Sequence, residues 1–442
     1  MKKIIASLFA VFLLLVSAQA QEINTVKLDS FFNALSANNR CMGSFAISQK
    51  GKIIYQKSIG YSSLEGNNKI PATSITLYRI GSVTKMFTAT LVFQLIEEGK
   101  LSLDTKLYKF FPQMPNAAKI TIENLLNHTS GLADYVNDTH NKTWILNPHT
   151  KAELLQSIAE KKVHFEPGAK QLYCNSGYLL LSYILEDITG KPYSKLIKNR
   201  ISGKIGLQHT FSSKANESEN AEARPYQHTT SWVKIKDIYF PNIIGVGDML
   251  STPTDMLTFI NALAAGKLVK PESYNQMRLF KDQDEFGMGL TKVPFYGKIG
   301  IGHGGDTYGS HSAAVRFDDH ISFSYCINGA NYPVNDISIA VLSIFYHRPF
   351  NIPDLKPVEI TSEDLDAHLG VYASKQIPLK IIFTKQGTVL MARATGQSEF
   401  PLETVTKDKF KFDTEDILIE FNTDKKEMIL KQSGKTTLFV RE

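Results

Sequence analysis

The pattern of apolar residues changes near residue 350 of this 442-residue chain, and this change constrains the fold more than any other feature. Before it, from about residue 26, helical patterns alternate with short strand patterns and turn residues, which is typical of a domain that mixes helices and strands. After it, short runs of β-forming residues recur between polar turns, at 379–383, 388–391, 400–405, 410–412, 417–421, 428–430 and 436–440. Because a single hydrophobic core usually stops growing below this chain length, we expect two domains. The second is predicted to be an antiparallel barrel or sandwich.

The connector between the two patterns contains Arg348-Pro349 and Ile352-Pro353 and is prone to turns. We place the boundary there, which gives a first domain over 21–350 and a second over 351–442.

The first twenty residues have the features of a secretory signal peptide. Lys2 and Lys3 precede an apolar run over 4–16, and Ala18-Gln19-Ala20 offers small residues for cleavage after Ala20. The run is short for a membrane span, no Cys follows the cut to accept a lipid, and no later stretch is long and apolar enough to span. We therefore expect a periplasmic or secreted protein.

The charge of the chain argues against nucleic acid as a partner. Loss of Lys2 and Lys3 lowers the formal net charge from +6 to +4, and no run of five or more Lys or Arg occurs. The three cysteines, at 41, 174 and 326, lie far apart without metal or redox spacing, so a disulfide framework is not expected, although one pair remains open.

Ser82 and Lys85 lie three residues apart at the start of a predicted helix over 81–98. This spacing puts both side chains on one face, where the amine can reach the hydroxyl. The positive end of the helix dipole favours negative charge near Ser82, and partial desolvation can lower the pKa of Lys85 toward that of a useful base. Since most Ser-x-x-Lys pairs are solvated surface, the motif needs support from the rest of the chain.

Tyr173-Cys174-Asn175 immediately precedes another predicted helix. A tyrosinate can carry a proton, and an amide side chain can bond a substrate peptide group. The alternative is structural, with Tyr173 in the core and Asn175 capping the helix. Cys174 should point the opposite way from its neighbours and be a buried, inert thiol.

The third motif is Gly302-His303-Gly304-Gly305-Asp306, followed by an apolar strand pattern. Glycine-rich backbone at a strand edge lets a substrate approach and exposes N–H groups to a developing oxyanion. A plain glycine-rich hairpin is the alternative. A metal site made by His303, His311 and Asp306 is a further one, although its spacing fits no standard site.

In this order the three motifs resemble those of the serine β-lactamase and penicillin-binding protein superfamily, in its class C-like branch. The resemblance covers roughly 26–345 and includes Leu125 to Leu132 as Leu-Leu-Asn-His-Thr-Ser-Gly-Leu, Pro167-Gly168, and Gly247 to Asp255. It implies an α+β fold, in which helices flank an antiparallel sheet and form an all-helical subdomain. It also implies a serine hydrolase without cofactor or metal, which forms an ester on its serine that water then hydrolyses.

The resemblance also implies a role for each matching position. Ser82 would be the nucleophile, and Lys85 and Tyr173 would transfer protons, with the principal base left open because the two groups would titrate together. Substrate would contact the residues Asn175, His303, Gly304, Gly305 and Asp306, with the oxyanion on the backbone N–H groups of Ser82 and Asp306.

Two departures from the family pattern bear on the substrate. His303 stands where β-lactamases and D-alanyl-D-alanine carboxypeptidases carry a Lys that receives a carboxylate, and a neutral imidazole binds an anion less well. His-x-Gly is similar to the peptidase and esterase members of the branch. Gly245 to Asp248 replaces a more apolar Gly-Gly-Leu pattern in the wall of the site.

The leading hypothesis is a peptidase that acts on small peptides, including those with D-residues. A β-lactamase, a carboxylesterase and a penicillin-binding sensor that is acylated without turnover are the alternatives, and the oligomeric state stays open. The segment from Leu369 to Val440 resembles the lipocalin-like barrel of several such peptidases. We expect it to stabilise or shield the catalytic domain without binding anything.

Overall fold

The computed structural model describes residues 23–442 except 67, 138–142, 213–221, 230, 282–283, 357 and 413–414. The signal peptide predicted for 1–20 lies outside these residues. Within the described ranges, no helix combines the length and apolar character that crossing a membrane requires.

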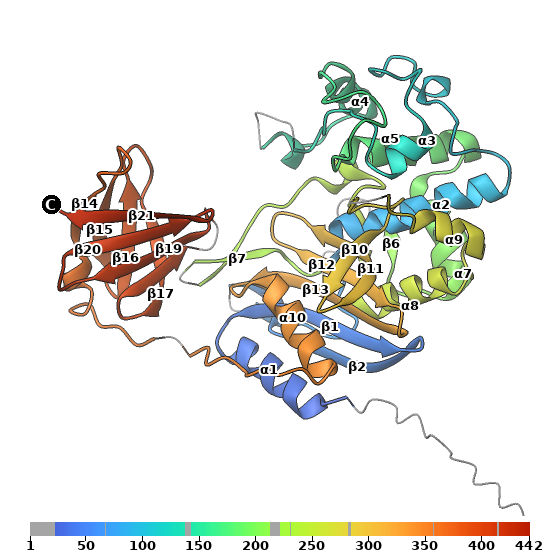
Figure 1. Cartoon of the computed structure of the whole chain (residues 1–442). Coiled ribbons are helices and arrows are strands. Elements are labelled where there is room, and N and C mark those ends of the chain that lie inside the picture. The colour runs from blue at the N-terminus through green and yellow to red at the C-terminus, as the bar shows by residue number, and fades with distance from the viewer. Residues whose placement is uncertain are drawn as a thin grey trace, which may run out of the picture.

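An antiparallel sheet with the order β10-β11-β12-β13-β1-β2 forms the centre of the N-terminal part (Figure 1). Its strands are β10 Thr291–Phe295, β11 Lys298–Asp306, β12 His311–Phe317, β13 Ile321–Ala330, β1 Cys41–Gln49 and β2 Lys52–Ile59. Two short strands, β7 Tyr226–His228 and β8 Trp232–Lys234, extend it from β13. The sequence Lys50-Gly51-Lys52 between two apolar stretches predicts a hairpin. It is confirmed, because Lys50 and Gly51 turn between β1 and β2 with φ of 50° and 80°.

Helices cover both faces of this sheet. On one face, α1 Thr25–Ala37 and α10 Val334–Phe345 bury an apolar core that includes Phe32, Phe45 and Val341. On the other lie α2 Thr84–Glu97 and α8 Pro253–Ala264. Residues 84 to 95 of α2 are all buried, so α2 is a core helix surrounded by protein.

A helical region packs on α2, at the top of the view in Figure 1. Its helices include α3 Ile122–Leu126, α4 Lys151–Ala159 and α5 Asn175–Thr189. Of the other helices, α6 Tyr193–Ile197 packs on α2 and α5, and α7 Gly203–Ile205 and α9 Pro271–Met277 lie beside α8. The small strands β3 Tyr61–Glu65, β4 Asn68–Pro71, β5 Tyr78–Arg79, β6 Phe211–Ser212 and β9 Met249–Ser251 form two further sheets. The predicted α+β class, with its helical subdomain, is confirmed.

The C-terminal strands close into an eight-stranded antiparallel barrel with its own apolar core. They are β14 Gly370–Ala373, β15 Lys380–Gln386, β16 Val389–Ala394, β17 Phe400–Thr406, β18 Lys409–Phe412, β19 Ile417–Asn422, β20 Glu427–Gln432 and β21 Lys435–Arg441. The rhythm of the sequence thus predicted seven of the eight strands, and β14, which pairs with both β15 and β21 to close the barrel, was not predicted as a strand. The predicted boundary near residue 350 lies between α10 and β14 and stays a prediction.

The barrel contacts the sheet domain through an ion pair between Arg40, just before β1, and Glu403 on β17. Both side chains are largely buried, 14% and 24% exposed, and Lys411 on β18 lies 3.5 Å from the same carboxylate. The contact therefore joins two elements that are more than 360 residues apart in sequence.

Candidate active site

Ser82 lies in a short 3-10 turn, Gly81–Val83, that leads directly into α2. Gly81 has a φ of +47°, and a Cβ there would lie 2.9 Å from the backbone nitrogen and oxygen of Asp306. The turn and the end of β11 are thus in close contact, and only glycine allows it. This packing puts Ser82 at the junction of α2 and the sheet.

Lys85 is fully buried in the first turn of α2, beneath Ser82. Its Nζ donates to Ser82 Oγ at 3.0 Å, to Asn175 Oδ1 at 2.8 Å and to the Val246 carbonyl at 3.0 Å. Burial lowers the pKa of Lys85 to about 7, and the negative charge of Asp134 opposes this shift. The amine is therefore near half-protonated at neutral pH.

Tyr173 contacts Ser82 from the other side. Its Oη donates to Ser82 Oγ at 2.7 Å, and burial raises the pKa of Tyr173 above its usual range, so the phenol keeps its proton at neutral pH. The ring packs on His128, with 4.5 Å between the two centroids. Ser82 Oγ is thus held between an amine and a protonated phenol.

Asn175 is the first residue of α5, and it uses both ends of its side chain within the protein. Its Oδ1 accepts from Lys85, while its Nδ2 donates to Asp134 Oδ2 at 2.9 Å. The carboxylate also accepts the backbone N–H of Asn175 at 3.0 Å, which fixes the orientation of the amide. The side chain does not cap α5, for which Cys174 is the capping residue. A contact between Asn175 and substrate stays a prediction.

His303 projects from β11 and is 4% exposed. Its Nδ1 lies 2.5 Å from the Gly304 carbonyl, which fixes the proton on Nδ1, and its Nε2 is buried without a hydrogen-bond partner. Burial, followed by the charge of Lys85, lowers the pKa of His303 to about 4. At neutral pH the imidazole is therefore uncharged, with a bare acceptor nitrogen.

A pocket of about 560 Å³ opens beside these groups. Six of the predicted residues line it: Ser82, Tyr173, Asn175, His303, Gly304 and Asp306. The other two lie behind its wall, since Lys85 is enclosed and a Cβ on Gly305 would clash with the Ile80 carbonyl at 2.1 Å. The apolar residues Val136, Ile238 and Ile243 also line it, as do the charged residues Glu285 and Lys292. The structure thus brings all eight predicted residues together.

Three contributors were not predicted from the sequence. Asp134 orients Asn175, and the Val246 carbonyl binds Lys85. His128 accepts the backbone N–H of Cys174 with its Nδ1 at 3.1 Å. The position of Asp134, two residues after the Leu125 to Leu132 motif, was the available signal.

Neither a reactive thiol nor a metal site is found near Ser82 among the described residues. Burial raises the pKa of the Cys174 thiol to about 12, which agrees with the expected inert thiol. Among the described residues, no group of three or more His, Cys, Asp or Glu side chains is arranged to hold a metal ion. His311 instead places its Nδ1 2.6 Å from Asp306 Oδ1.

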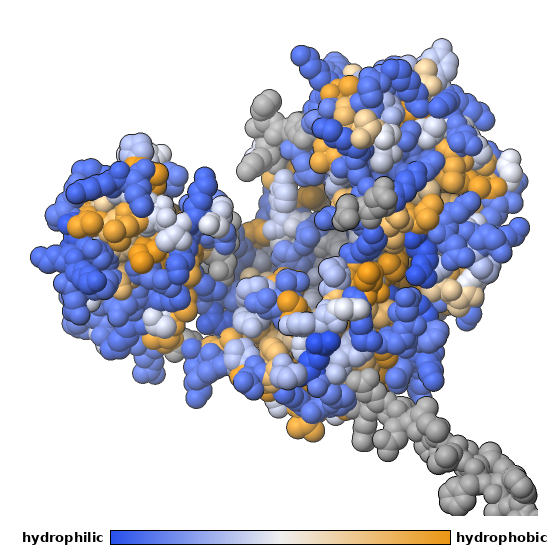
Figure 2. All heavy atoms as spheres, viewed as in Figure 1, coloured by the Kyte–Doolittle hydropathy of each residue, from blue (hydrophilic) through white to orange (hydrophobic). Residues whose placement is uncertain are grey.

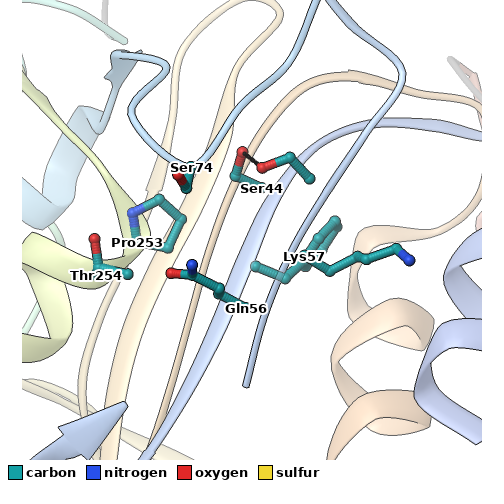
Figure 3. A pocket seen from close by; sticks show the side chains of 8 residues that line it. Ser44, Gln56, Lys57, Ser74, Pro253 and Thr254 are labelled. Atoms are coloured by element: carbon teal, nitrogen blue, oxygen red, sulfur yellow. Dashed lines mark hydrogen bonds between the residues drawn. The ribbon is translucent and has the colours of Figure 1, made fainter. Parts of the chain in front are cut away.

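A second, smaller pocket lies between β1, β2 and the start of α8 (Figure 3). Two of its hydroxyl groups are bonded to each other, because Ser44 Oγ lies 2.8 Å from Ser58 Oγ, and Ser44 Oγ also lies 2.9 Å from Tyr78 Oη. The pocket shares no residue with the one beside Ser82.

Comparison with known proteins agrees with this geometry. The beta-lactamase family pattern matches residues 28–343. A putative penicillin-binding protein, PbpX, of Bacillus subtilis is 31% identical over 64% of this chain and 67% of its own length. A teichoic acid D-alanine hydrolase of Staphylococcus aureus is 28% identical over 64% of this chain and 69% of its own. A crystal structure of the D-amino acid amidase from Ochrobactrum anthropi is similar, with a TM-score of 0.64 and 26% identity over 73% of this chain and 99% of its own. The chain belongs to the beta-lactamase family.

Proposed function

We propose that this protein is an exported serine hydrolase that cleaves amide or ester bonds of D-aminoacyl compounds through an acyl-enzyme on Ser82. The observation that carries the proposal is the position of Ser82 Oγ, 3.0 Å from a buried amine and 2.7 Å from a protonated phenol. Both distances are within hydrogen-bond reach, as proton transfer to or from a nucleophile requires.

Lys85 is the better candidate for the base. As a neutral amine it has two N–H groups and one lone pair. The Asn175 Oδ1 and the Val246 carbonyl can accept the two N–H groups, which leaves the lone pair for the proton of Ser82. Because its pKa is about 7, a large share of Lys85 is neutral at physiological pH.

Attack by Ser82 on the substrate carbonyl would move its proton to Lys85 and form a tetrahedral oxyanion. We assign this oxyanion to the backbone N–H groups of Ser82 and Asp306, whose segments are in close contact. Tyr173, as a protonated phenol, is placed to pass a proton to the leaving amine or alcohol and to be reprotonated from Lys85. Water would then hydrolyse the ester, with Lys85 again as the base.

The character of His303 favours an aminoacyl substrate over a β-lactam. The His303 imidazole is uncharged at neutral pH, so at this position a substrate carboxylate meets no charged partner. One relative is named a teichoic acid D-alanine hydrolase, and one similar structure is that of a D-amino acid amidase. Both names indicate a substrate that contains a D-amino acid.

The cellular setting is part of the proposal. We place the mature protein in the periplasm or outside the cell, on the strength of the signal-like pattern at 1–20. Residues 21–350 would form the hydrolase domain and 351–442 a lipocalin-like domain. Small peptides or esters are the proposed partners, and nucleic acid is not expected.

A panel of chromogenic substrates tests the assignment. Purified protein would be offered D-alanyl and L-alanyl p-nitroanilide, a p-nitrophenyl ester and nitrocefin, with Ser82→Ala as the matched control. We expect D-alanyl turnover that Ser82→Ala abolishes, together with fluorophosphonate labelling of wild type alone. Turnover of nitrocefin alone would indicate a β-lactamase. A stable penicillin adduct on Ser82 without turnover of any substrate would indicate a sensor.

A further inference from the structure

The C-terminal barrel contains a pocket that the proposed reaction does not use. It has a volume of about 360 Å³, within the range of small-molecule sites, and it opens at one end of the barrel. Inward-facing apolar residues from six consecutive strands and the residue before β15 form its wall: Leu379, Ile381, Ala392, Ala394, Phe400, Phe412, Ile417, Ile419 and Leu430.

A gradient of side-chain size along the barrel axis creates this pocket. At the closed end, Tyr372, Phe383, Phe410 and Phe421 pack edge to face and fill the interior. Toward the open end, the inward positions of β16 change from Leu390 to alanine at 392 and 394. An eight-stranded barrel has room for one layer of large side chains, so small residues leave a void that no described residue fills.

The polar groups of the pocket are confined to its mouth, and are Gln397, Ser398, Glu415 and Gln432. Gln432 Nε2 already donates to the Glu415 carbonyl at 2.9 Å. The volume would accommodate about 12 water molecules, but apolar walls offer them few hydrogen bonds. An apolar ligand is therefore a better occupant than water, with its polar end at the mouth.

We infer that the barrel binds an uncharged apolar molecule with a hydrogen-bonding group at its outer end. The apolar wall disfavours a polar ligand, and the acidic residue Glu415 in the lining disfavours an anionic end group. This role differs from the purely shielding role that the sequence indicated. It does not depend on the chemistry of Ser82.

Fluorescence titration of the full-length protein with N-phenyl-1-naphthylamine, an uncharged apolar probe, tests the inference. We expect saturable binding by wild type and by Ser82→Ala. In Ala394→Phe the new ring would occupy the pocket, and we expect affinity to fall at least about tenfold. Ala392→Leu fills the same space with a smaller side chain and serves as the second variant if Ala394→Phe does not fold.

Arg393→Leu is the matched control, because residue 393 lies between the two alanines but is exposed on the outer face of β16. It should leave probe affinity within about twofold of wild type, with folding checked by circular dichroism. The inference is wrong if wild type shows no saturable binding. It is also wrong if a folded pocket-filling variant binds as wild type does, or if Ser82→Ala removes the binding and so places the probe in the other pocket.

Discussion

Lys85 has an amine enclosed by protein, with three oxygen atoms within 3.0 Å and no exposed surface. Two effects on its pKa oppose each other, since burial lowers it and the Asp134 carboxylate raises it. The balance leaves the amine able to release and accept a proton near neutral pH. The reactivity of the site therefore depends on residues that do not touch the substrate.

The pH dependence of the reaction should follow Lys85. Because the base must be neutral, kcat/KM should rise with pH through about 7. Asp134→Asn removes the charge that holds the pKa of Lys85 up, so this limb should move to lower pH, and the maximal rate should fall because Asn175 loses its orienting partner. Rate profiles from pH 5 to 9 measure both effects.

Asp187→Asn is the control for that experiment, since Asp187 is exposed on α5 and far from the pocket lining. It should leave the profile unchanged. An Asp134→Asn profile with the wild-type limb would show that Asp134 has a structural role alone.

Replacing His303 should change substrate preference. In His303→Lys an ammonium group would face the pocket where an uncharged imidazole now lies. We expect kcat/KM for carboxylate-bearing nitrocefin to increase about tenfold relative to that for D-alanyl p-nitroanilide, since a charged donor strengthens a bond to a carboxylate. His303→Asn, which stays neutral, should not shift the ratio. Steady-state kinetics with both substrates would measure this ratio. An equal change of the ratio in the two variants would contradict the assignment.

The residues of the site differ in how far the sequence could predict them. Ser82, Lys85, Tyr173 and His303 lie in short motifs, and their order along the chain indicated a common site. The role of Asp134 arises only when the turn after Gly131 packs against the start of α5, which a local pattern does not specify. The Val246 carbonyl is a backbone group and has no side-chain signature at all.

At the scale of elements, the contact between β11 and the turn that carries Ser82 sets the geometry of the site. The backbone of Gly305 lies so close to this turn that a Cβ would be 2.1 Å from the Ile80 carbonyl and 2.9 Å from the Ser82 nitrogen. Gly304, one residue earlier, faces open space, where the nearest atom would be 3.9 Å away. Close packing therefore requires glycine at 305, whereas there is space for a side chain at 304.

A matched pair of alanine substitutions tests whether the close contact at Gly305 contributes to stability. Gly305→Ala should destabilise the protein by about 1–3 kcal/mol, as overpacking of a filled site does, because backbone atoms must move. Gly304→Ala should leave the free energy of unfolding within about 0.5 kcal/mol of wild type. Urea denaturation followed by tryptophan fluorescence and circular dichroism would measure both, and equal losses would show that the close contact is not what matters.

The sequence predicted individual helices and strands better than it predicted how the strands of the barrel pair. Helices α2 and α5 followed from periodicity and turn residues, and so did the β1–β2 hairpin. In the barrel, the alternation of each strand was visible, but the pairing of β14 with β21 joins residues almost 70 positions apart. Such pairing is a tertiary property, and the choice between barrel and sandwich could not be made from local patterns.

At the scale of the whole molecule, the hydrolase part and the barrel are joined by the chain and by the Arg40–Glu403 ion pair. Figure 2 shows apolar residues grouped on the barrel face turned to the viewer, within a surface that is otherwise largely hydrophilic. The Arg40–Glu403 ion pair is a defined contact between the two parts, and its contribution to the free energy of unfolding can be measured.

Glu403→Gln should weaken this contact. Arg40 would keep a charge that is 14% exposed, without its carboxylate partner, and Arg40 Nε already lacks a hydrogen-bond partner. We expect a loss of about 1–3 kcal/mol, less than for a fully buried pair because Glu403 is 24% exposed. Calorimetry would record a lower Tm, whereas Glu363→Gln, at an exposed position, should not change it. An unchanged Tm in Glu403→Gln would mean that the pair adds nothing to stability.

The bond between Asn175 and Lys85 joins the first residue of α5 to the first turn of α2, so the distance between two packed helices sets where the amine lies. A shift of about 1 Å between these helices would leave every helix intact yet carry the amine out of reach of Ser82. Heat should therefore inactivate the protein several degrees before it melts, and enzymatic half-life will report on the helical core earlier than any spectroscopic signal.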